Sequence, residues 1–125
     1  MRQARSFLVV ADDPERLFLF STTLHRKFPN SIVQTCRDSE AAREVARTQV
    51  LDVIVCHRAT DLDELPLLEA LRAVSSTPIV AVSGPHFAGD ALASGASRHL
   101  NTEQWLLLGT VVGELIGARA DHDTK

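Results

Sequence analysis

Cysteine is scarce in this sequence, with Cys36 and Cys56 the only two among 125 residues. Neither belongs to a CxxC pair, the spacing that would indicate a zinc site or a redox centre. Each lies at the end of an apolar segment, which is typical of a small buried thiol. Cysteine use therefore gives no sign of a disulfide framework, and we expect a cytoplasmic protein.

Long hydrophobic runs and clusters of basic residues are also missing. No apolar stretch approaches the roughly 20 residues that cross a bilayer. Residues 1–5 lead directly into an apolar segment without the pattern of a signal peptide. The net charge is −3, only two lysines occur and the 11 arginines are scattered. We therefore expect no membrane segment, and no nucleic-acid surface, because such a surface needs clustered Lys and Arg.

Apolar runs that alternate with helical patterns make up nearly all of the sequence. The runs predict strands at 7–10, 31–36, 51–56, 78–83 and 97–100. The helical patterns that follow them lie at 14–28, 38–46, 65–71, 88–93 and 102–116. The polar residues 119–125 are expected to fray. No repeat, linker or low-complexity segment interrupts the alternation, so we expect one domain.

Two local signals place helix ends. Asp13 followed by Pro14 predicts the start of the first helix, since an N-cap side chain and a proline at the first helical position favour it. Gly95 is placed to end the fourth helix in the left-handed conformation. The first helix shows a core-facing stripe formed by Leu17, Phe20, Leu24 and Phe28.

Strands that are apolar on both faces and alternate with helices are typical of a parallel sheet covered on both sides. Five such units in about 115 residues predict an α/β, flavodoxin-like, doubly wound sheet with strand order 2-1-3-4-5. In this architecture ligands bind at the carboxyl ends of the strands. The polar residues expected there are Asp12, Asp13, His57, Arg58, Ser83 and Thr102.

Four segments together resemble the receiver domains of two-component response regulators, the CheY-like superfamily. FLVVADDPERL is similar to the first strand of that family with its acidic cluster, and LDVIVCHRATDLDELPLLEAL to its third strand and helix. TPIVAVSG is similar to its fourth strand, and ALASGASRHLNTEQW to the Gly-Ala pair before the fifth. The resemblance covers residues 6–117. It implies a receiver-like domain at 1–118 and a polar tail at 119–125.

The resemblance also implies which residues to compare with the phosphorylation site of the family. There, two acidic residues and an acceptor aspartate hold magnesium, a Ser or Thr bonds the phosphoryl group, and a lysine neutralises it. Asp12 falls on the second acidic position, with Asp13 one place later, whereas Ala11 occupies the first. His57 stands at the acceptor position and Ser83 matches the hydroxyl.

The last two positions of the family pattern are also changed. Thr102 replaces the lysine, and His99 replaces the aromatic switch residue. Magnesium prefers oxygen ligands, and phosphoryl transfer depends on charge compensation. We therefore expect a pseudo-receiver that binds magnesium weakly or not at all and is not an enzyme. It would act through protein contacts, with a histidine kinase or an effector as possible partner.

Several alternatives remain open for these residues. The simplest is that His57 fills the vacated pocket with its ring near Asp12 or Asp13, where a histidinium would be favoured and would titrate near physiological pH. A second is a phosphoryl-accepting switch that uses His57 or the Asp12/Asp13 cluster. Asp12, His57 and Ser83 could form the carboxylate–imidazole–hydroxyl set of a hydrolase. Asp12, Asp13 and His57 are weak candidates for a transition-metal site.

The last predicted helix carries more apolar residues than one core face requires. Either the core face is unusually wide, or some of these residues face a partner. The candidates for an interface are Trp105, Leu106, Leu107 and Val111. Gly109 and Gly113, at i and i+4, would let a second helix approach closely. Receiver domains use the surface of their fourth helix, fifth strand and fifth helix for dimers or effectors, and together with the two glycines this favours a homodimer.

Overall fold

The computed structural model describes residues 4–58 and 61–123. Five strands form one parallel sheet in the order β2-β1-β3-β4-β5, which confirms the predicted topology. Their bounds are β1 Ser6–Ala11, β2 Ile32–Cys36, β3 Val53–His57, β4 Ile79–Ser83 and β5 Arg98–Asn101. All neighbouring strands run parallel, so their carboxyl ends meet at one edge of the sheet.

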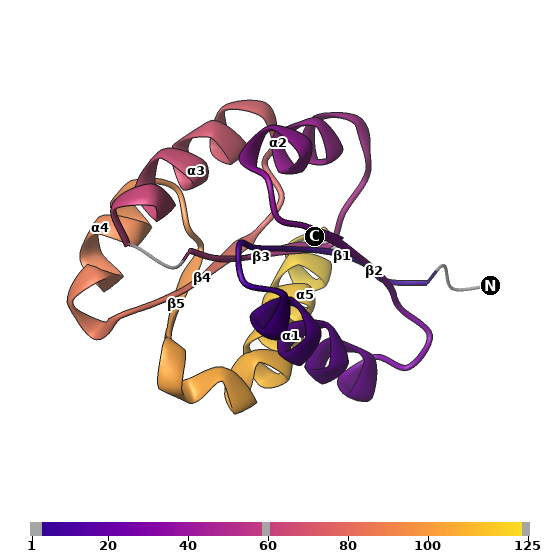
Figure 1. Cartoon of the computed structure of the whole chain (residues 1–125). Helices are drawn as coiled ribbons and strands as arrows, with labels where there is room; N and C mark the ends of the chain where they lie inside the picture. The colour runs from indigo at the N-terminus through magenta and orange to yellow at the C-terminus, as the bar shows by residue number, and fades with distance from the viewer. Residues whose placement is uncertain (1–3, 59–60, 124–125) are drawn as a thin grey trace.

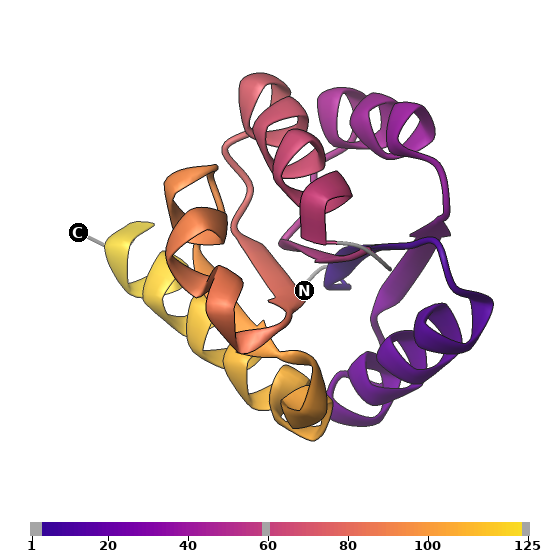
Figure 2. The same cartoon turned by 60° about the vertical axis from the view of Figure 1, so that its left-hand side comes forward.

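Helices cover both faces of the sheet. Helices α2 (Ser39–Thr48) and α3 (Asp61–Val74) lie next to each other on one face, together with α4 (Ala88–Ala93). Helices α1 (Pro14–Lys27) and α5 (Leu108–Asp123) lie side by side on the other face (Figures 1 and 2). Two short 3₁₀ helices precede α4 and α5, namely η1 (Pro85–Phe87) and η2 (Thr102–Leu107).

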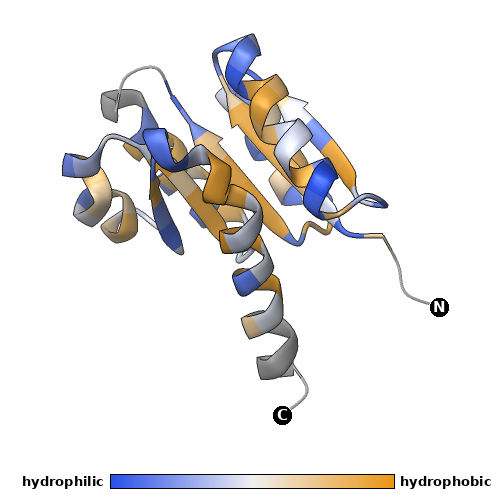
Figure 3. Cartoon of the chain, turned by 90° about the horizontal axis from the view of Figure 1, so that it is seen from below, coloured by the Kyte–Doolittle hydropathy of each residue, from blue (hydrophilic) through white to orange (hydrophobic). Residues whose placement is uncertain are grey.

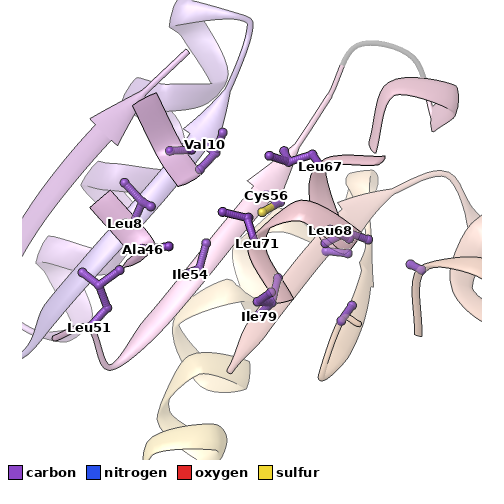
Figure 4. Packing of buried hydrophobic residues seen from close by; sticks show 14 residues of the cluster. Leu8, Val10, Ala46, Leu51, Ile54, Cys56, Leu67, Leu68, Leu71 and Ile79 are labelled. Carbon is purple, nitrogen blue, oxygen red and sulfur yellow. The ribbon is translucent and has the colours of Figure 1, made fainter. Parts of the chain in front are cut away.

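The alternation of side chains along each strand gives the molecule two cores. On β1, Leu8 and Val10 face α2 and α3, whereas Phe7 and Val9 face α1 and α5. Figure 4 shows the first core, in which leucines of α3 meet the middle strands. Figure 3 shows the apolar strands behind α1 and α5. Because both faces are buried, the strands read as continuous apolar runs in the sequence.

The predicted signals at helix ends are confirmed. The Oδ1 atom of Asp13 accepts a hydrogen bond of 2.9 Å from the Glu15 amide at the start of α1, and Pro14 is the first helical residue. Gly95 has a φ of 123°, the left-handed conformation expected after α4. A Cβ there would meet the Cβ of Arg72 at 2.9 Å, so glycine is required for both its conformation and its size.

Arg72, near the end of α3, donates hydrogen bonds to three backbone carbonyls in two turns. Its Nε and Nη2 atoms donate to the Gly95 carbonyl at 3.1 and 2.7 Å. Its Nη1 atom donates to the carbonyls of Ser75 and Thr77 at 3.0 and 2.9 Å. One half-buried guanidinium thus fixes the turn after α3 against the turn before β5.

Three predicted boundaries were wrong. α3 begins at Asp61 and places Pro66 inside the helix, whereas the apolar stripe began at Leu65 and suggested a later start. The predicted helix at 102–116 is two segments, because Asn101 and Gln104 form a capping box and Gln104 is not helical (φ −98°, ψ 22°). α5 continues to Asp123 instead of ending at 116. Residues 124–125 of the predicted tail lie outside the described part.

Within residues 4–58 and 61–123, no helix has the length and apolarity needed to cross a bilayer.

Candidate functional site at the carboxyl ends of the strands

The polar residues predicted at the strand ends do lie at one edge of the sheet. His57 and Ser83 are the last residues of β3 and β4, Asp12 follows β1, and Thr102 follows β5. Their hydrogen bonds, however, do not join them into one pocket. They divide into three separate groups, and each group has its own partners among the described residues.

His57 forms the first group with β4 and α1. Its Nδ1 atom lies 2.9 Å from the carbonyl oxygen of Val82. A carbonyl oxygen only accepts, so the imidazole carries its proton on Nδ1 and donates it. The register of β3 and β4 ends at Cys56 and Ala81, so the ring bonds the next carbonyl along β4. Its plane meets the Phe20 ring edge-on, with centroids 5.9 Å apart.

The expectation that the His57 ring lies near Asp12 or Asp13 finds no support in these contacts. The ring contacts Val82 and Phe20, on the face that α1 and α5 cover, and no ion pair joins it to either carboxylate in the described part of the chain. Asp13 instead caps α1. A pH switch built on a histidinium between two carboxylates therefore has no basis in this geometry.

Ser83 forms the second group with His99 of β5. Its Oγ atom lies 2.9 Å from the Nε2 atom of His99, and Ser83 is only 1% exposed. The residue at the hydroxyl position is thus bonded directly to the residue at the switch position. This bond was not predicted, although both positions had been singled out. It follows from the register, in which Ala81 pairs with His99 and Ser83 with Asn101.

Asp12 belongs to a third group, which includes two arginines. The Nε and Nη2 atoms of Arg37 donate to the main-chain oxygen of Asp12 at 3.3 and 3.0 Å. Arg58 is 7% exposed, and its Nη1 atom donates to the Arg37 carbonyl at 2.8 Å. Its Nη2 atom donates to the Ser39 hydroxyl. The sequence offered one signal for this group, an arginine directly after a buried strand.

The alternation of side chains explains why the groups are separate. His57 is two and four residues from Val55 and Val53 on β3, so its side chain points to the same face, which α1 and α5 cover. Ser83 is two and four residues from Ala81 and Ile79 on β4, so its side chain points to the face that α2, α3 and α4 cover. His57 and Ser83 therefore point to opposite faces of the sheet, and the alternative of a hydrolase set with Asp12 finds no support in this geometry.

The transition-metal alternative finds no support in the geometry either. Among the described residues, no three His, Cys, Asp or Glu side chains are grouped so that they could hold a metal ion. The Oδ1 atom of Asp13 is engaged at the start of α1, and His57 donates its Nδ1 proton to a carbonyl. At the other end of the edge, Thr102 begins η2 and supplies no positive charge.

The two cysteines lie on either side of β1. Val10 pairs with Cys36 of β2 and with Cys56 of β3, so the two cysteines are about two strand spacings, or 10 Å, apart. That exceeds the separation a disulfide can bridge. Burial raises the pKa of both thiols, with a further contribution from Asp38 at Cys36 and from Glu64 at Cys56. Both therefore remain free, unreactive thiols.

The candidate interface residues divide into exposed and buried ones. Leu106 and Leu107 are 72% and 48% exposed, whereas Trp105 is half-buried against the core. Val111 is 8% exposed and belongs to that core, so its assignment to a partner surface was wrong.

The two glycines of α5 also have a role within the chain. A Cβ at Gly109 would lie 3.1 Å from the Cβ of Lys27, and one at Gly113 would lie 3.9 Å from Lys27 and Phe28. Gly109 therefore allows α1 to approach α5 closely, whereas Gly113 leaves room for a methyl group. Gly109 is thus occupied by α1 of the same chain, and packing of a second molecule against α5 stays a prediction.

Comparisons with known proteins find solved structures with a similar fold but low sequence identity to this chain. No protein-family model and no curated protein matches the chain. The receiver domain of a Francisella response regulator is 22% identical with a TM-score of 0.79, and 92% of this chain covers 98% of that one.

Two further solved structures agree. The receiver domain of a sensor histidine kinase from Pseudomonas aeruginosa, with magnesium in its active-site cleft, is 21% identical with a TM-score of 0.77 (92% of this chain, 99% of that one). The signal receiver domain of an HD domain-containing protein from Pseudomonas fluorescens is 15% identical with a TM-score of 0.79 (100% and 96%). With its strand order and its two helical layers, the chain has the CheY-like fold of response-regulator receiver domains.

Proposed function

We propose that this chain is a receiver-like signalling module of the two-component class that acts through protein contacts and without aspartyl phosphorylation. The bond from His57 to the Val82 carbonyl carries the proposal. At the position where the resembling family has its acceptor carboxylate, this chain has a proton donor fixed to the backbone. Thr102 stands where that family has its lysine, so the charge of a phosphoryl group would also go unbalanced.

The magnesium ion that the fold implies fits these residues poorly. Ala11 has no side-chain oxygen, the Oδ1 atom of Asp13 caps α1, and His57 offers nitrogen where magnesium prefers oxygen. Asp12 alone is too few ligands for such an ion. We therefore derive no step through magnesium and propose no catalytic activity.

The direct test is exposure of the chain to acetyl phosphate, and separately to beryllofluoride, each with magnesium. We expect no mass increase of one phosphoryl group and no change in the amide spectrum around Ser83 and His99. A stable phosphorylated species would overturn the proposal. His57→Asn then identifies the acceptor, because it abolishes an imidazole label and leaves a carboxylate label intact.

We infer that the partners are signalling proteins, a histidine kinase or an effector, and that a second copy of the chain covers the exposed leucines of η2. Leu106 and Leu107 are adjacent, exposed and held by the Asn101 capping box, so they present apolar area at little cost in conformational entropy. Free thiols at Cys36 and Cys56 suit the reducing cytoplasm that this proposal requires.

Sedimentation of variants tests the homodimer. Leu107→Glu should be monomeric at concentrations at which the unmodified chain is a dimer. Phe18→Glu is the matched control, because Phe18 is also an exposed apolar residue, 69% exposed, but lies on α1. A monomeric unmodified chain, or equal loss of the dimer in both variants, would overturn this part of the proposal.

A further inference from the structure

A cleft of about 420 Å³ lies between α2 and α3, beside the carboxyl ends of β1 and β3. We call it the arginine cleft, and its lining residues are Asp12, Arg37, Asp38, Ser39, Arg58, Pro66, Leu67 and Ala70. Its volume is in the range of small-molecule sites. We infer that the arginine cleft binds a phosphate monoester, with the phosphate on the two guanidinium groups and the organic part on α3.

Arg58 supplies a buried, positioned cation to the cleft. It is 7% exposed, and it is held by two neutral oxygens, the Arg37 carbonyl and the Ser39 hydroxyl. Among the side chains that the structure describes, no carboxylate lies within ion-pair distance of this guanidinium. These two neutral acceptors position the guanidinium without cancelling its charge, whereas Glu64, a buried carboxylate that acts on the same Cys56 thiol as Arg58, reduces the attraction that an anion would meet.

Arg37 supplies a second, exposed cation. Its side chain is exposed, and its bonds to the Asp12 main-chain oxygen use two of its five N–H groups. The others remain for a ligand. The Arg37 carbonyl accepts from Arg58, so the two arginines are coupled through the backbone of one residue. A pair of guanidinium groups with planar forks is the arrangement that proteins favour for phosphate recognition.

The start of α2 adds polar groups to the same cleft. Ser39 accepts from Arg58, so its own hydroxyl proton remains a donor. Asp38 accepts from the amides of Glu40 and Ala41 at 3.2 and 3.4 Å and thereby takes up those donors. The phosphate would therefore be held by the guanidinium groups and Ser39, with only a long-range contribution from the helix dipole.

The wall formed by α3 is apolar and explains why we infer a monoester instead of free phosphate. Pro66, Leu67 and Ala70 line this side of the cleft, and Leu67 extends from α3 toward Cys56 near the end of β3 (Figure 4). α2 and α3 lie side by side on this face (Figure 1), so the cleft has a charged wall and an apolar wall. A phosphate ion would use only the charged one.

Asp12 and Asp38 also line the cleft and limit its affinity. Their two negative charges oppose the two arginines at distances at which charges still interact through the solvent. We therefore expect weak binding, with dissociation constants of about 0.1–1 mM. The same carboxylates disfavour ligands with more than one phosphate group.

The test is a titration of the isotope-labelled chain with inorganic phosphate and with phenyl phosphate, at matched ionic strength with sodium chloride. Both probes should shift the Ser39 amide and the Arg37 Nε–H, and phenyl phosphate should bind more tightly and also shift Ala70. Arg37→Gln should lower the affinity for both probes about tenfold, as expected for the loss of one charge-assisted hydrogen bond. Arg43→Gln, a change at an exposed arginine of α2 outside the cleft, should leave the affinity unchanged.

Ser39→Ala provides a second measurement, because it removes the hydroxyl donor of the cleft and one of the two bonds that position Arg58. It should weaken both probes severalfold. Absence of shifts at 10 mM of either probe, or equal losses in Arg37→Gln and Arg43→Gln, would overturn the inference, as would phosphate binding as tightly as phenyl phosphate. None of these outcomes depends on the proposed function, because the titration measures reversible binding in a cleft apart from His57 and Ser83.

Discussion

Replacing His57 by aspartate restores the acceptor residue of the family that this chain resembles, yet we expect it to weaken the protein and to produce no phosphorylation. The imidazole donates to the Val82 carbonyl and contacts the edge of Phe20. A carboxylate can do neither. It would also place a negative charge beside the carbonyl oxygen that the imidazole now satisfies.

The magnitude follows from these contacts. Loss of the hydrogen bond removes about 1 kcal/mol, and the carbonyl left without a donor adds about 1 kcal/mol. Loss of the aromatic contact removes about 0.5 kcal/mol more. His57→Asp should therefore lose about 2–3 kcal/mol of unfolding free energy. For a chain of this size that lowers Tm by roughly 6–12 °C.

His57→Asn separates the donor from the rest of the ring. Its side-chain amide can reach the Val82 carbonyl from a position close to that of Nδ1, so it should lose only about 1 kcal/mol. Urea denaturation of the three proteins measures the order, with the unmodified chain most stable and the aspartate variant least. Equal stability of the aspartate and asparagine variants would refute the reasoning, and so would acyl phosphate formation by His57→Asp with acetyl phosphate and magnesium.

Three further predictions concern residues away from the strand ends. Arg72→Lys keeps the charge but loses the forked contacts with three carbonyls, so the free energy of unfolding measured in urea should fall by about 2 kcal/mol. A loss below about 0.5 kcal/mol would show that these contacts are dispensable. Burial raises the pKa of Cys56 above its ordinary value of 9.0, so the unfolded chain releases that proton first and stability falls as the pH rises past about 9. Cys56→Ala should show a shallower fall between about pH 8 and 10, and an unchanged slope would contradict the assignment. Gly113→Ala should gain about 0.5–1 kcal/mol of stability in thermal unfolding, because its new methyl group meets only ordinary contacts, whereas Gly109→Ala should gain nothing, since it must displace Lys27.

The fold could be predicted because its signals are local and repeated. Strands buried on both faces appear as unbroken apolar runs, and helices between them show a period of 3.6 residues. Asp13 and Gly95 mark helix ends through their own chemistry, and both were placed correctly. The start of α3 was misplaced because its first turn is polar, and the apolar stripe begins only at Leu65.

The contacts at the site could not be predicted because they depend on which face each side chain takes. The sequence placed His57 and Ser83 at the same edge, and it did not show that one faces α1 and the other α3. To predict which face each side chain takes, the end of each strand must be known to within one residue. Arg58 was noticed as a polar residue after β3, but its bonds to Arg37 and Ser39 join segments about 20 residues apart.

The end of β4 is where the two faces of the sheet meet. Val82 accepts from His57 on β3, and Ser83 bonds to His99 on β5, so neighbouring strands hold both residues through side chains. Displacing this end would break both bonds, at about 1 kcal/mol each. A conformation without them would be populated about 30-fold less than the one with them, all else being equal. The end of β4 is thus held by this chain's own residues, which is what the proposed function without phosphorylation requires.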